Sequence, residues 1–571
     1  MARATGAVKR KPEKRDDRQL SLVPVSSPKK SAKPRPEGRS GKPAKATRPG
    51  GKKRRRATAE SLATKQRDIS VAEFFTKNRH LLGFDNPTKA LLTTTKEAVD
   101  NALDACEDAG ILPDVHVTIT QLNGGERFRV TVKDNGPGIV KAQIPKIFGK
   151  LLYGSRFHTL RQARGQQGIG ISAAGMYGQL TTGVPIRIVS RTKRSTPANL
   201  YTLRIDTQKN RPEILEESQV DVEDWDHGTE VGIELEAVYR KGPHSVDSYV
   251  EQTAVANPHA TIRYESPDGE VMIYDSTTTD LPPEPREMKP HPYGVELGLL
   301  LRIFQASRGL TLKGALQNNF SRVSARVADD ICKQANVRGS LRATRLAGDD
   351  VEAVYRAIQS VKIMAPPSSS VVPIGEDLII AGLKRRYNAA FYFSCTRRPS
   401  VYRGNPFVIE AGVALGGDLS ADGPAQVMRF ANRVPLQYQK GGCGITAAVT
   451  ETSWKNYGIH QPRGSLPIGP MAIFVHMASA WVPFTSESKE AIAHYPEIIS
   501  EIKHALQSCG RQMGRHLRAV KREGEEARKR QYIEKYLPHI GIALKDMLGL
   551  TDRQRDAING KLERLFEKKA R

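Results

Sequence analysis

Alternating apolar and polar positions after residue 68 predict a sheet with a helix in front of it. Five runs alternate with a period of two, which is typical of half-buried strands: VHVTIT, RFRVTVKDN, PIRIVSRT, LYTLRID and TEVGIELEA. The segment ISVAEFFTKNRHLLGFDNP leads into the opening helix, where Pro87 occupies a position that a first helical turn tolerates. Residues 68–290 are therefore expected to form one α+β domain.

The pattern changes twice further along the chain. Residues 291–367 contain short helical runs with basic connections and predict a small helical domain. Residues 368–532 return to an α+β pattern, in which DLIIAG, NAAFYFSCT, FVIEAGVAL and MAIFVHMASAWV are strand candidates. A helical pattern runs from Lys489 to about residue 532, and residues 533–571 predict a short helical tail.

Charge sets the first 67 residues apart from the rest. They are rich in Lys, Arg, Pro, Ser and Gly, so a disordered basic tail is expected. Residues 1–56 hold 20 Lys and Arg against four acidic residues, a net charge of +16 out of +27 for the chain. This excess predicts a polyanionic partner, most simply nucleic acid. The run GKKRRR is either a loose DNA-binding arm or a nuclear address.

Other bulk features exclude several classes of protein. An apolar run of about 18 residues is absent, so no transmembrane helix is predicted, and the basic N-terminus lacks the apolar region of a secretory signal. The five cysteines are scattered without CxxC spacing, which argues against a zinc site and against disulfides. We expect an intracellular, reducing location, which is the cytoplasm or nucleoid of a prokaryote or the nucleus of a eukaryote.

The stretch KEAVDNALDA carries the first candidate chemistry. Glu97, Asp100, Asn101 and Asp104 are spaced i, i+3, i+4, i+7, so all four are predicted on one helix face. Taken alone, this is an ordinary amphipathic helix. Two later segments favour a nucleotide site instead. In such a site the Asn side-chain oxygen is a suitable ligand for Mg²⁺, and a Glu one turn earlier can orient a water toward a γ-phosphate.

Those two segments are glycine-rich. DNGPGI follows a strand, so Asp134 could accept a hydrogen bond from an adenine amino group while Gly136 and Gly138 allow close approach of the base. RGQQGIGISAAGMYG runs into a helix, whose free N–H groups suit phosphates. Each alone is an ordinary turn or loop. There is no GxxxxGK[ST] and no G-x-G-x-x-G after a strand, which argues against P-loop and dinucleotide folds.

Together these segments resemble the GHKL ATPases, and most closely the B subunits of type IIB DNA topoisomerases (topoisomerase VI). The resemblance rests on KEAVDNALDA, VKDNGPGI, KIFGKLLYGSRFHTLRQARGQQGIGISAAGMYGQLTTG, HGTEVGIELE, RFANRVPLQY and SKEAIA, and covers about residues 68–530. It implies three domains: a Bergerat-fold ATPase domain with an N-terminal strap, a helix-two-turns-helix domain, and a ribosomal-protein-like transducer with a long exit helix. The strap would be FFTKNRHLLGF.

The resemblance also implies roles for individual residues. Glu97 would be the general base and Asn101 the Mg²⁺ ligand, while Asp134 would read adenine with Thr229 nearby. Lys489 of SESKEAIA would be the switch lysine that reaches the γ-phosphate, although a glycine is expected before it. The remaining predicted nucleotide-binding residues are Gly136, Gly138, Ser155, Arg156 and the lid residues Gly165, Gln166, Gln167, Gly168, Ile169, Gly170, Ile171 and Ser172.

The function implied is ATP-driven closure of a homodimer that gates passage of one DNA duplex through another, relaxing supercoils and decatenating DNA. Cleavage would reside on a separate A subunit in an A2B2 heterotetramer, with ATP and Mg²⁺ as substrate and cofactor. The alternatives are an ATP-gated DNA clamp without cleavage, a histidine kinase and a chaperone. A kinase needs a phosphoacceptor histidine on a dimerising helix, whereas His80 lies in the strap, and the basic body suits DNA better than general clients.

Overall fold

The computed structural model describes residues 59, 63–64, 66, 68–156, 159–165, 168–223 and 225–570. The chain divides into two units, Met1–Arg67 and Asp68–Arg571, and both sheets belong to the second. The predicted basic tail and its GKKRRR run lie almost entirely outside the described residues. Within them, no helix has the length and apolar character needed to cross a bilayer. All five cysteines are described, and each is a buried free thiol.

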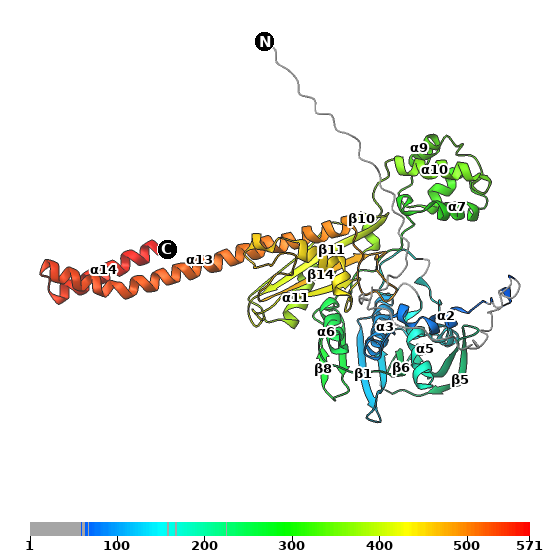
Figure 1. Ribbon diagram of the computed structural model, residues 1–571, viewed down its shortest axis with the longest axis horizontal. Helices are drawn as coiled ribbons and strands as arrows, with labels where there is room; N and C mark the ends of the chain where they lie inside the picture. Colours follow the sequence, from blue (N-terminus) through cyan, green and yellow to red (C-terminus); the bar gives the residue numbers. More distant parts are fainter. Residues whose placement is uncertain are drawn as a thin grey trace, which may run out of the picture. The chain divides into compact units, whose positions relative to one another are not determined.

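The first sheet of the described chain has eight strands (Figure 1). In spatial order they are β5 (Arg211–Val220), β4 (Ala198–Asp206), β3 (Ile186–Arg191), β6 (Gly228–Glu236), β2 (Arg127–Asp134), β1 (Asp114–Leu122), β7 (Thr261–Glu265) and β8 (Val271–Tyr274). Neighbours run antiparallel except β1 and β7. The five strands predicted here are confirmed. Strands β5, β7 and β8 were not predicted: β5 is mostly exposed and does not alternate, and β7 and β8 have only five and four residues.

Helices pack on this sheet and on one another to form the first core. They are α3 (Pro87–Asp108), α4 (Ile144–Gly149), α5 (Gly170–Thr182) and α6 (Val246–Ala256). Helix α3 begins as the sequence indicates, since the Asn86 side chain accepts from the Lys89 amide and Pro87 stands in the first turn. Helix α2 (Val71–Lys77) and the 3-10 turn η1 (Arg79–Leu82) precede α3 in the chain, and both contact α5.

A helical region with its own core follows. Its elements are η4 (Pro292–Gly294), α7 (Leu297–Ala306), α8 (Leu312–Asn319), α9 (Ala325–Ala335), η5 (Ala343–Arg345) and α10 (Gly348–Ser360). Leu300, Phe304, Leu316, Ile331 and Val354 are buried in this core, which includes no residue of either sheet.

The second sheet has strand order β10 (Ser400–Tyr402), β11 (Asn405–Leu415), β14 (Met471–Ser479), β12 (Gln426–Ala431), β13 (Val434–Pro435), and β9 (Phe391–Thr396) also pairs with β11. Strands β12 and β14 are parallel. Around the sheet lie η6 (Ser368–Ser370), α11 (Glu376–Arg386), η7 (Lys440–Gly442), α12 (Gly444–Glu451), η8 (Trp454–Tyr457), α13 (Pro496–Leu548) and α14 (Asp552–Ala570).

The prediction of a strand at DLIIAG is wrong, because these residues belong to helix α11. Ile379 and Leu383 are four residues apart and both are buried against Val255 and Ala256 of α6. A Cβ on Gly382 would lie 2.4 Å from the Val255 carbonyl oxygen, so the two helices touch through their backbones. This contact joins the first sheet region to the second.

The long helix also differs from the prediction at both ends. Lys489 lies in a loop with a φ of 52°, and α13 starts only at Pro496, in a position where proline is favoured. The helix passes through Pro538 and ends at Gly549, which adopts the left-handed conformation of a helix C-cap. The helical tail expected over residues 533–571 is helical at 533–548, which continue α13, and at 552–570, which form α14.

Candidate active site

A cleft of about 790 Å³ opens between helix α3, the end of β2 and the start of α5. Sites for small molecules typically have volumes of about 300–1,000 Å³. Most of the predicted site residues line it: Glu97, Asn101, Asp134, Gly138, Ser155, Arg156, Gly165, Gly168, Ile169, Gly170, Ile171, Thr229 and Lys489. Gly136 and Ser172 do not, and Gln166 and Gln167 lie outside the described residues.

Three of the four polar residues predicted on one face of α3 line the cleft, namely Glu97, Asn101 and Asp104. The prediction is wrong for Asp100, which is buried and accepts a hydrogen bond of 3.0 Å from the Tyr249 hydroxyl of α6. Four positions spaced over two turns span a wide arc of the helix, and α6 covers the edge of that arc. Burial raises the pKa of Asp100 to about 6, and it lowers the pKa of Lys96 one turn earlier.

Asp134 stands at the end of β2 with one carboxylate oxygen fixed. That oxygen accepts hydrogen bonds from the backbone amides of Gly136, at 2.9 Å, and Thr229, at 3.1 Å. Burial raises the pKa of Asp134 to about 6, although both amide bonds act in the opposite direction. The side chain is thus held rigidly at the wall of the cleft, where it can read a hydrogen-bond donor.

The glycine turn after Asp134 is shaped by close backbone contacts. Gly138 has a φ of +70°, and a Cβ there would fall 2.0 Å from the Arg191 carbonyl oxygen. Gly136 supplies an amide to Asp134 rather than a surface of the cleft. The Thr229 hydroxyl lies 3.0 Å from the Ser190 hydroxyl. The DNGPGI turn therefore packs backbone against backbone, and any side chain at Gly138 would disrupt this packing.

The second glycine-rich segment forms the opposite wall. Helix α5 starts at Gly170 without a side-chain cap, so its first amides have no such partner. A Cβ on Gly170 would lie 1.7 Å from Glu97 Oε2, which places the Glu97 carboxylate directly against this helix start. Ser172 is buried instead, and its hydroxyl donates to the carbonyls of Ile147 and Lys150. Its contacts are structural, which differs from the predicted lid role.

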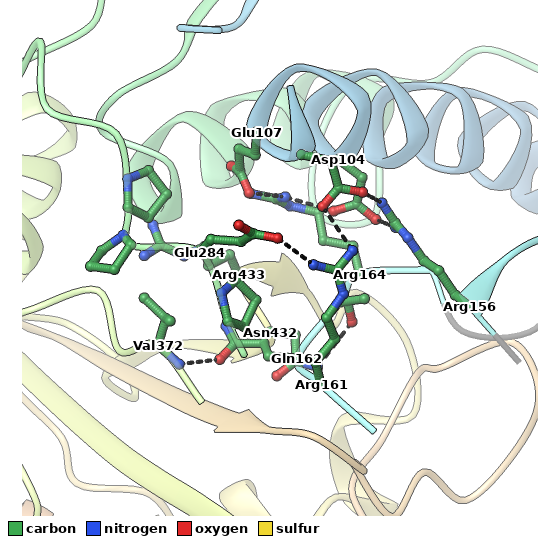
Figure 2. A pocket seen from close by; sticks show the side chains of 15 residues that line it. Asp104, Glu107, Arg156, Arg161, Gln162, Arg164, Glu284, Val372, Asn432 and Arg433 are labelled. Carbon is green, nitrogen blue, oxygen red and sulfur yellow. Dashed lines mark hydrogen bonds and ion pairs between the residues drawn. The ribbon is translucent and has the colours of Figure 1, made fainter. Parts of the chain in front are cut away.

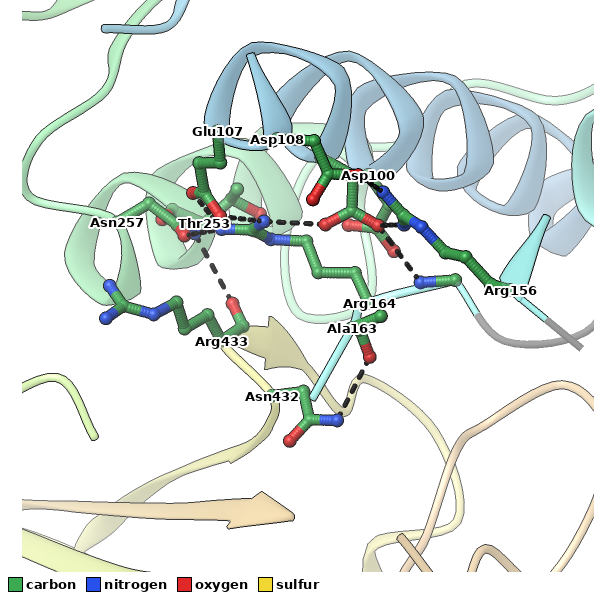
Figure 3. A network of polar contacts seen from close by, with 12 residues as sticks. Asp100, Glu107, Asp108, Arg156, Ala163, Arg164, Thr253, Asn257, Asn432 and Arg433 are labelled. Atoms are coloured by element: carbon green, nitrogen blue, oxygen red, sulfur yellow. Dashed lines mark hydrogen bonds and ion pairs between the residues drawn. The ribbon is translucent and has the colours of Figure 1, made fainter. Parts of the chain in front are cut away.

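Arg156 lines the cleft but is paired with acidic residues of α3. Its guanidinium contacts Asp104 (Figure 2) and lies 2.5 Å from Asp108 (Figure 3). Although burial opposes its charge, these carboxylates raise its pKa. Ser155, its neighbour, also lines the cleft.

Lys489 enters the cleft from the loop between β14 and α13, far along the chain from the other residues. It is 7% exposed, and its Nζ donates a 3.1 Å hydrogen bond to the Arg164 carbonyl oxygen. Glu490, the next residue of this loop, forms a 2.5 Å ion pair with Lys89, and this pair connects the loop to the start of α3. The loop therefore contacts both α3 and the residue that precedes the lid.

The sequence interpretation missed the importance of Arg164 itself. Its buried guanidinium lies 2.8 Å from Asp104 and 2.6 Å from Glu107, and it also donates to Asn257 (Figure 2, Figure 3). Burial alone would raise the pKa of Glu107, but Arg164 and His259 hold it well below its usual range. An arginine before a glycine-rich lid, with acidic residues at i and i+3 on α3, was the available signal.

The donor set fits a nucleoside triphosphate with a hard cation. Asp134 offers a fixed acceptor, and the uncapped start of α5 offers amides to phosphate oxygens. Asn101, exposed on α3, offers an amide oxygen of the kind that Mg²⁺ prefers. Among the described residues, no group of three or more His, Cys, Asp and Glu forms a further metal site.

Two family models match parts of the chain. Residues 87–209 match the family described as histidine kinase-, DNA gyrase B- and HSP90-like ATPase. Residues 366–530 match the topoisomerase VI B subunit transducer family. The ATPase region of topoisomerase II from Saccharomyces cerevisiae is 11% identical and aligns over 79% of this chain and all of that one, with a TM-score of 0.36. At that score, assignment to a family rests on the sequence relatives.

Two archaeal relatives are much more similar in sequence. Both are named as the B subunit of type 2 DNA topoisomerase 6. The protein from Methanococcoides burtonii is 48% identical over 86% of this chain and 79% of its own length. The protein from Archaeoglobus fulgidus is 44% identical over 85% of this chain and 80% of its own length. With this identity over most of both chains, the chain belongs to the family of type 2 DNA topoisomerase 6 B subunits.

Proposed function

We propose that the chain binds ATP in the cleft between α3 and α5, that this binding closes two copies around DNA, and that hydrolysis allows them to reopen. Membership of the family makes the chain the ATP-hydrolysing subunit of a type II DNA topoisomerase. The observation that carries the site assignment is the meeting of Glu97, Asp134 and Lys489 in one cleft, although they come from two sheet regions.

Asp134 is proposed to recognise the adenine base. Its fixed carboxylate accepts a hydrogen bond from the exocyclic amino group, which guanine lacks at that position. Gly138 packs closely against the Arg191 backbone and keeps the turn beside the base compact, and Thr229 supports the carboxylate through its amide. These residues supply binding energy and selectivity for the base.

Glu97 is proposed as the general base. It lies one turn before Asn101 on α3, with its carboxylate against the start of α5. From there it orients a water toward the γ-phosphate and accepts its proton. Asn101 would hold Mg²⁺, which neutralises charge on the phosphates. Arg156, Gly165 and the residues from Gly168 to Ile171 would enclose the phosphates.

Lys489 is proposed to distinguish ATP from ADP. In the structure its Nζ is bonded to the Arg164 carbonyl, at the edge of the cleft. A short movement from that carbonyl to a γ-phosphate oxygen exchanges one hydrogen bond for a stronger charged one. Because Lys489 belongs to the transducer region, loss of the γ-phosphate would release that region from the ATPase domain.

A separate A subunit is proposed to cleave the DNA in an A2B2 assembly. The relatives are themselves named as B subunits. The net charge of +27 suits contact with DNA phosphates, and binding should weaken steeply with added salt. In this assembly, the chain provides the gate that opens and closes with each ATP.

The test combines ATP hydrolysis with molecular mass by light scattering on the full chain. The wild type should hydrolyse ATP slowly and dimerise only with a non-hydrolysable analogue and Mg²⁺. Glu97→Ala should abolish hydrolysis but still bind the analogue and dimerise. Glu126→Ala, a substitution on the exposed β1–β2 turn, is the matched control and should behave as wild type. Absence of both nucleotide binding and a mass change would reject the proposed function.

A further inference from the structure

The segment that leads into the lid is held by residues from much later in the chain. We call residues 160–164 the lid base. Leu160 accepts a 3.0 Å hydrogen bond from the Met288 amide. The Gln162 backbone amide donates a 2.9 Å hydrogen bond to the Ser370 carbonyl oxygen. The Gln162 side-chain oxygen accepts a 2.7 Å hydrogen bond from the Val372 backbone amide. Both Ser370 and Val372 precede the second sheet, so the lid base is already tied to the connection between domains.

Two more contacts reach the lid base from the transducer region itself. The Ala163 carbonyl accepts a 3.0 Å hydrogen bond from Asn432 Nδ2, and the Arg164 carbonyl accepts one from Lys489 Nζ. Figure 3 shows Asn432 reaching up to Ala163 while the Arg164 side chain extends toward α3. The lid base therefore lies between α3 on one side and the transducer region on the other.

Asn432 is anchored rigidly within the second sheet. It and Arg433 form the two-residue turn between β12 and β13, with φ values of 47° and 67°. Asn432 Nδ2 also donates to the Ser479 carbonyl at 3.0 Å, and its Oδ1 accepts from the Ser479 amide at 2.9 Å. The Arg433 amide donates to His476 Nε2 at 2.9 Å. Any movement of β14 must therefore carry Asn432 with it.

We propose that Asn432 is a positioning residue that transmits movement of the transducer region to the lid base, in parallel with Lys489. It does not line the cleft and so would not contact a nucleotide there, and its bond to the lid base would be kept when nucleotide binds. Lys489, in contrast, is proposed to leave Arg164 for the γ-phosphate. Asn432 would then keep the lid base in register with the transducer region while Lys489 changes partner. The catalytic part of this inference rests on the proposed function.

Asn432→Asp tests the contact with the smallest change of shape. The new oxygen would face the Ala163 and Ser479 carbonyls, while the acceptor for the Ser479 amide is kept. Asn432→Gly is the second variant, because glycine tolerates the positive φ and removes the side chain altogether. Asn336→Gly is the matched control: Asn336 is an exposed left-handed residue that caps α9.

The first readout is amide hydrogen exchange of Gln162 and Gly165 in the full chain without nucleotide. Both Asn432 variants should raise this exchange by about fivefold, the effect of one lost hydrogen bond, whereas exchange in β11 stays unchanged. Unchanged exchange at the lid base would overturn the proposal. An equal increase throughout β11 would also overturn it, because Asn432 would then only stabilise the sheet.

The second readout is ATP turnover. The Asn432 variants should lower kcat by about fivefold with a smaller change in KM for ATP, because no atom that contacts nucleotide is altered. A change confined to KM would contradict the positioning role. If the wild type hydrolyses no ATP, the proposed function fails, but the exchange experiment still decides whether Asn432 holds the lid base.

Discussion

The carboxylate of Glu97 occupies the space that a side chain on Gly170 would need. A Cβ at Gly170 would lie 1.7 Å from Glu97 Oε2 and 2.4 Å from its Cδ. The first residue of α5 is thus glycine because of a neighbour on α3, and its φ lies outside the left-handed range. The proposed general base and the start of the lid helix are in direct contact, so each fixes the position of the other.

Gly170→Ala should therefore lower kcat for ATP hydrolysis by about a hundredfold, since displacement of a catalytic group by about 1 Å has effects of that size. Steady-state hydrolysis measures the change. Gly298→Ala is the matched control, because Gly298 also lies in the first turn of a helix, α7, and has open space around it. Normal turnover in Gly170→Ala would show that Glu97 does not act from its present position.

Lys489→Ala should weaken hydrolysis and uncouple it from strand passage. The charge that distinguishes ATP from ADP is lost, while Asp134 and the phosphate-binding amides remain. Parallel measurements of ATP turnover and of plasmid relaxation, the latter with the A subunit present, give the coupling ratio. Lys209→Ala, on the exposed β4–β5 turn, should leave both rates unchanged. Unchanged turnover with full relaxation by Lys489→Ala would exclude Lys489 as the switch.

Binding of an adenine nucleotide should weaken as the pH falls through about 6. Burial raises the pKa of Asp134 from its ordinary value of 3.8 to about 6, so the carboxylate is ionised at pH 7 and protonated below 6. Protonation removes an acceptor for the adenine amino group, and the dissociation constant should rise by up to about tenfold per pH unit below pH 6.

The matched variant for this titration is Asp134→Asn, which cannot ionise. It should bind a non-hydrolysable ATP analogue weakly, and with little change between pH 5 and 7. Calorimetric titration of both proteins at each pH provides the comparison. If the wild-type affinity does not change across pH 6, or if the Asn variant shows the same pH dependence, then Asp134 does not recognise adenine.

Arg164→Ala should destabilise the protein by about 3–5 kcal/mol, because it leaves the buried carboxylates of Asp104 and Glu107 without their cation. Thermal unfolding of the full chain measures the shift of the midpoint. Arg302→Ala removes an exposed arginine of α7 and should change stability by no more than about 0.5 kcal/mol. Equal midpoints for the two variants would show that the Arg164 cluster contributes little to stability.

Acid should affect the same cluster in a defined direction. The folded-state pKa of Glu107 lies below its usual value, because its carboxylate is paired with Arg164 and His259. This pairing therefore stabilises the fold above about pH 4.5, and the stabilisation is lost as the pH falls further. Arg164→Ala should reduce this dependence without abolishing it, because His259 still lowers the Glu107 pKa. The difference in midpoint between wild type and Arg164→Ala should therefore shrink in acid, and a difference that grows in acid would contradict the assignment.

The local pattern of the sequence was sufficient for much of the first sheet and for the cleft. Strands that are buried on one face alternate visibly, which is why β1, β2, β3, β4 and β6 were predictable while the exposed β5 was not. The same limit explains α11. A short apolar run such as DLIIAG fits a strand or a helix equally well, and only its contact with α6 decides between them.

The site residues also divide into those that a local motif indicates and those that only packing brings to the site. Glu97, Asn101, Asp134 and Gly138 stand in short local motifs. Each motif alone is an ordinary helix or turn, but their combination predicted a nucleotide site, and all four residues line one cleft. The sequence by itself determined these, together with the basic charge that suits a nucleic-acid partner.

Tertiary structure alone decided the rest. It turned Asp100 toward Tyr249, placed Arg164 between Asp104 and Glu107, and brought Lys489 to the Arg164 carbonyl. These partners are separated along the chain by tens to hundreds of residues, and no periodicity spans such distances. Contacts of this kind form only when the two sheets and the helices between them have packed, because packing decides which polar groups are buried together and must pair.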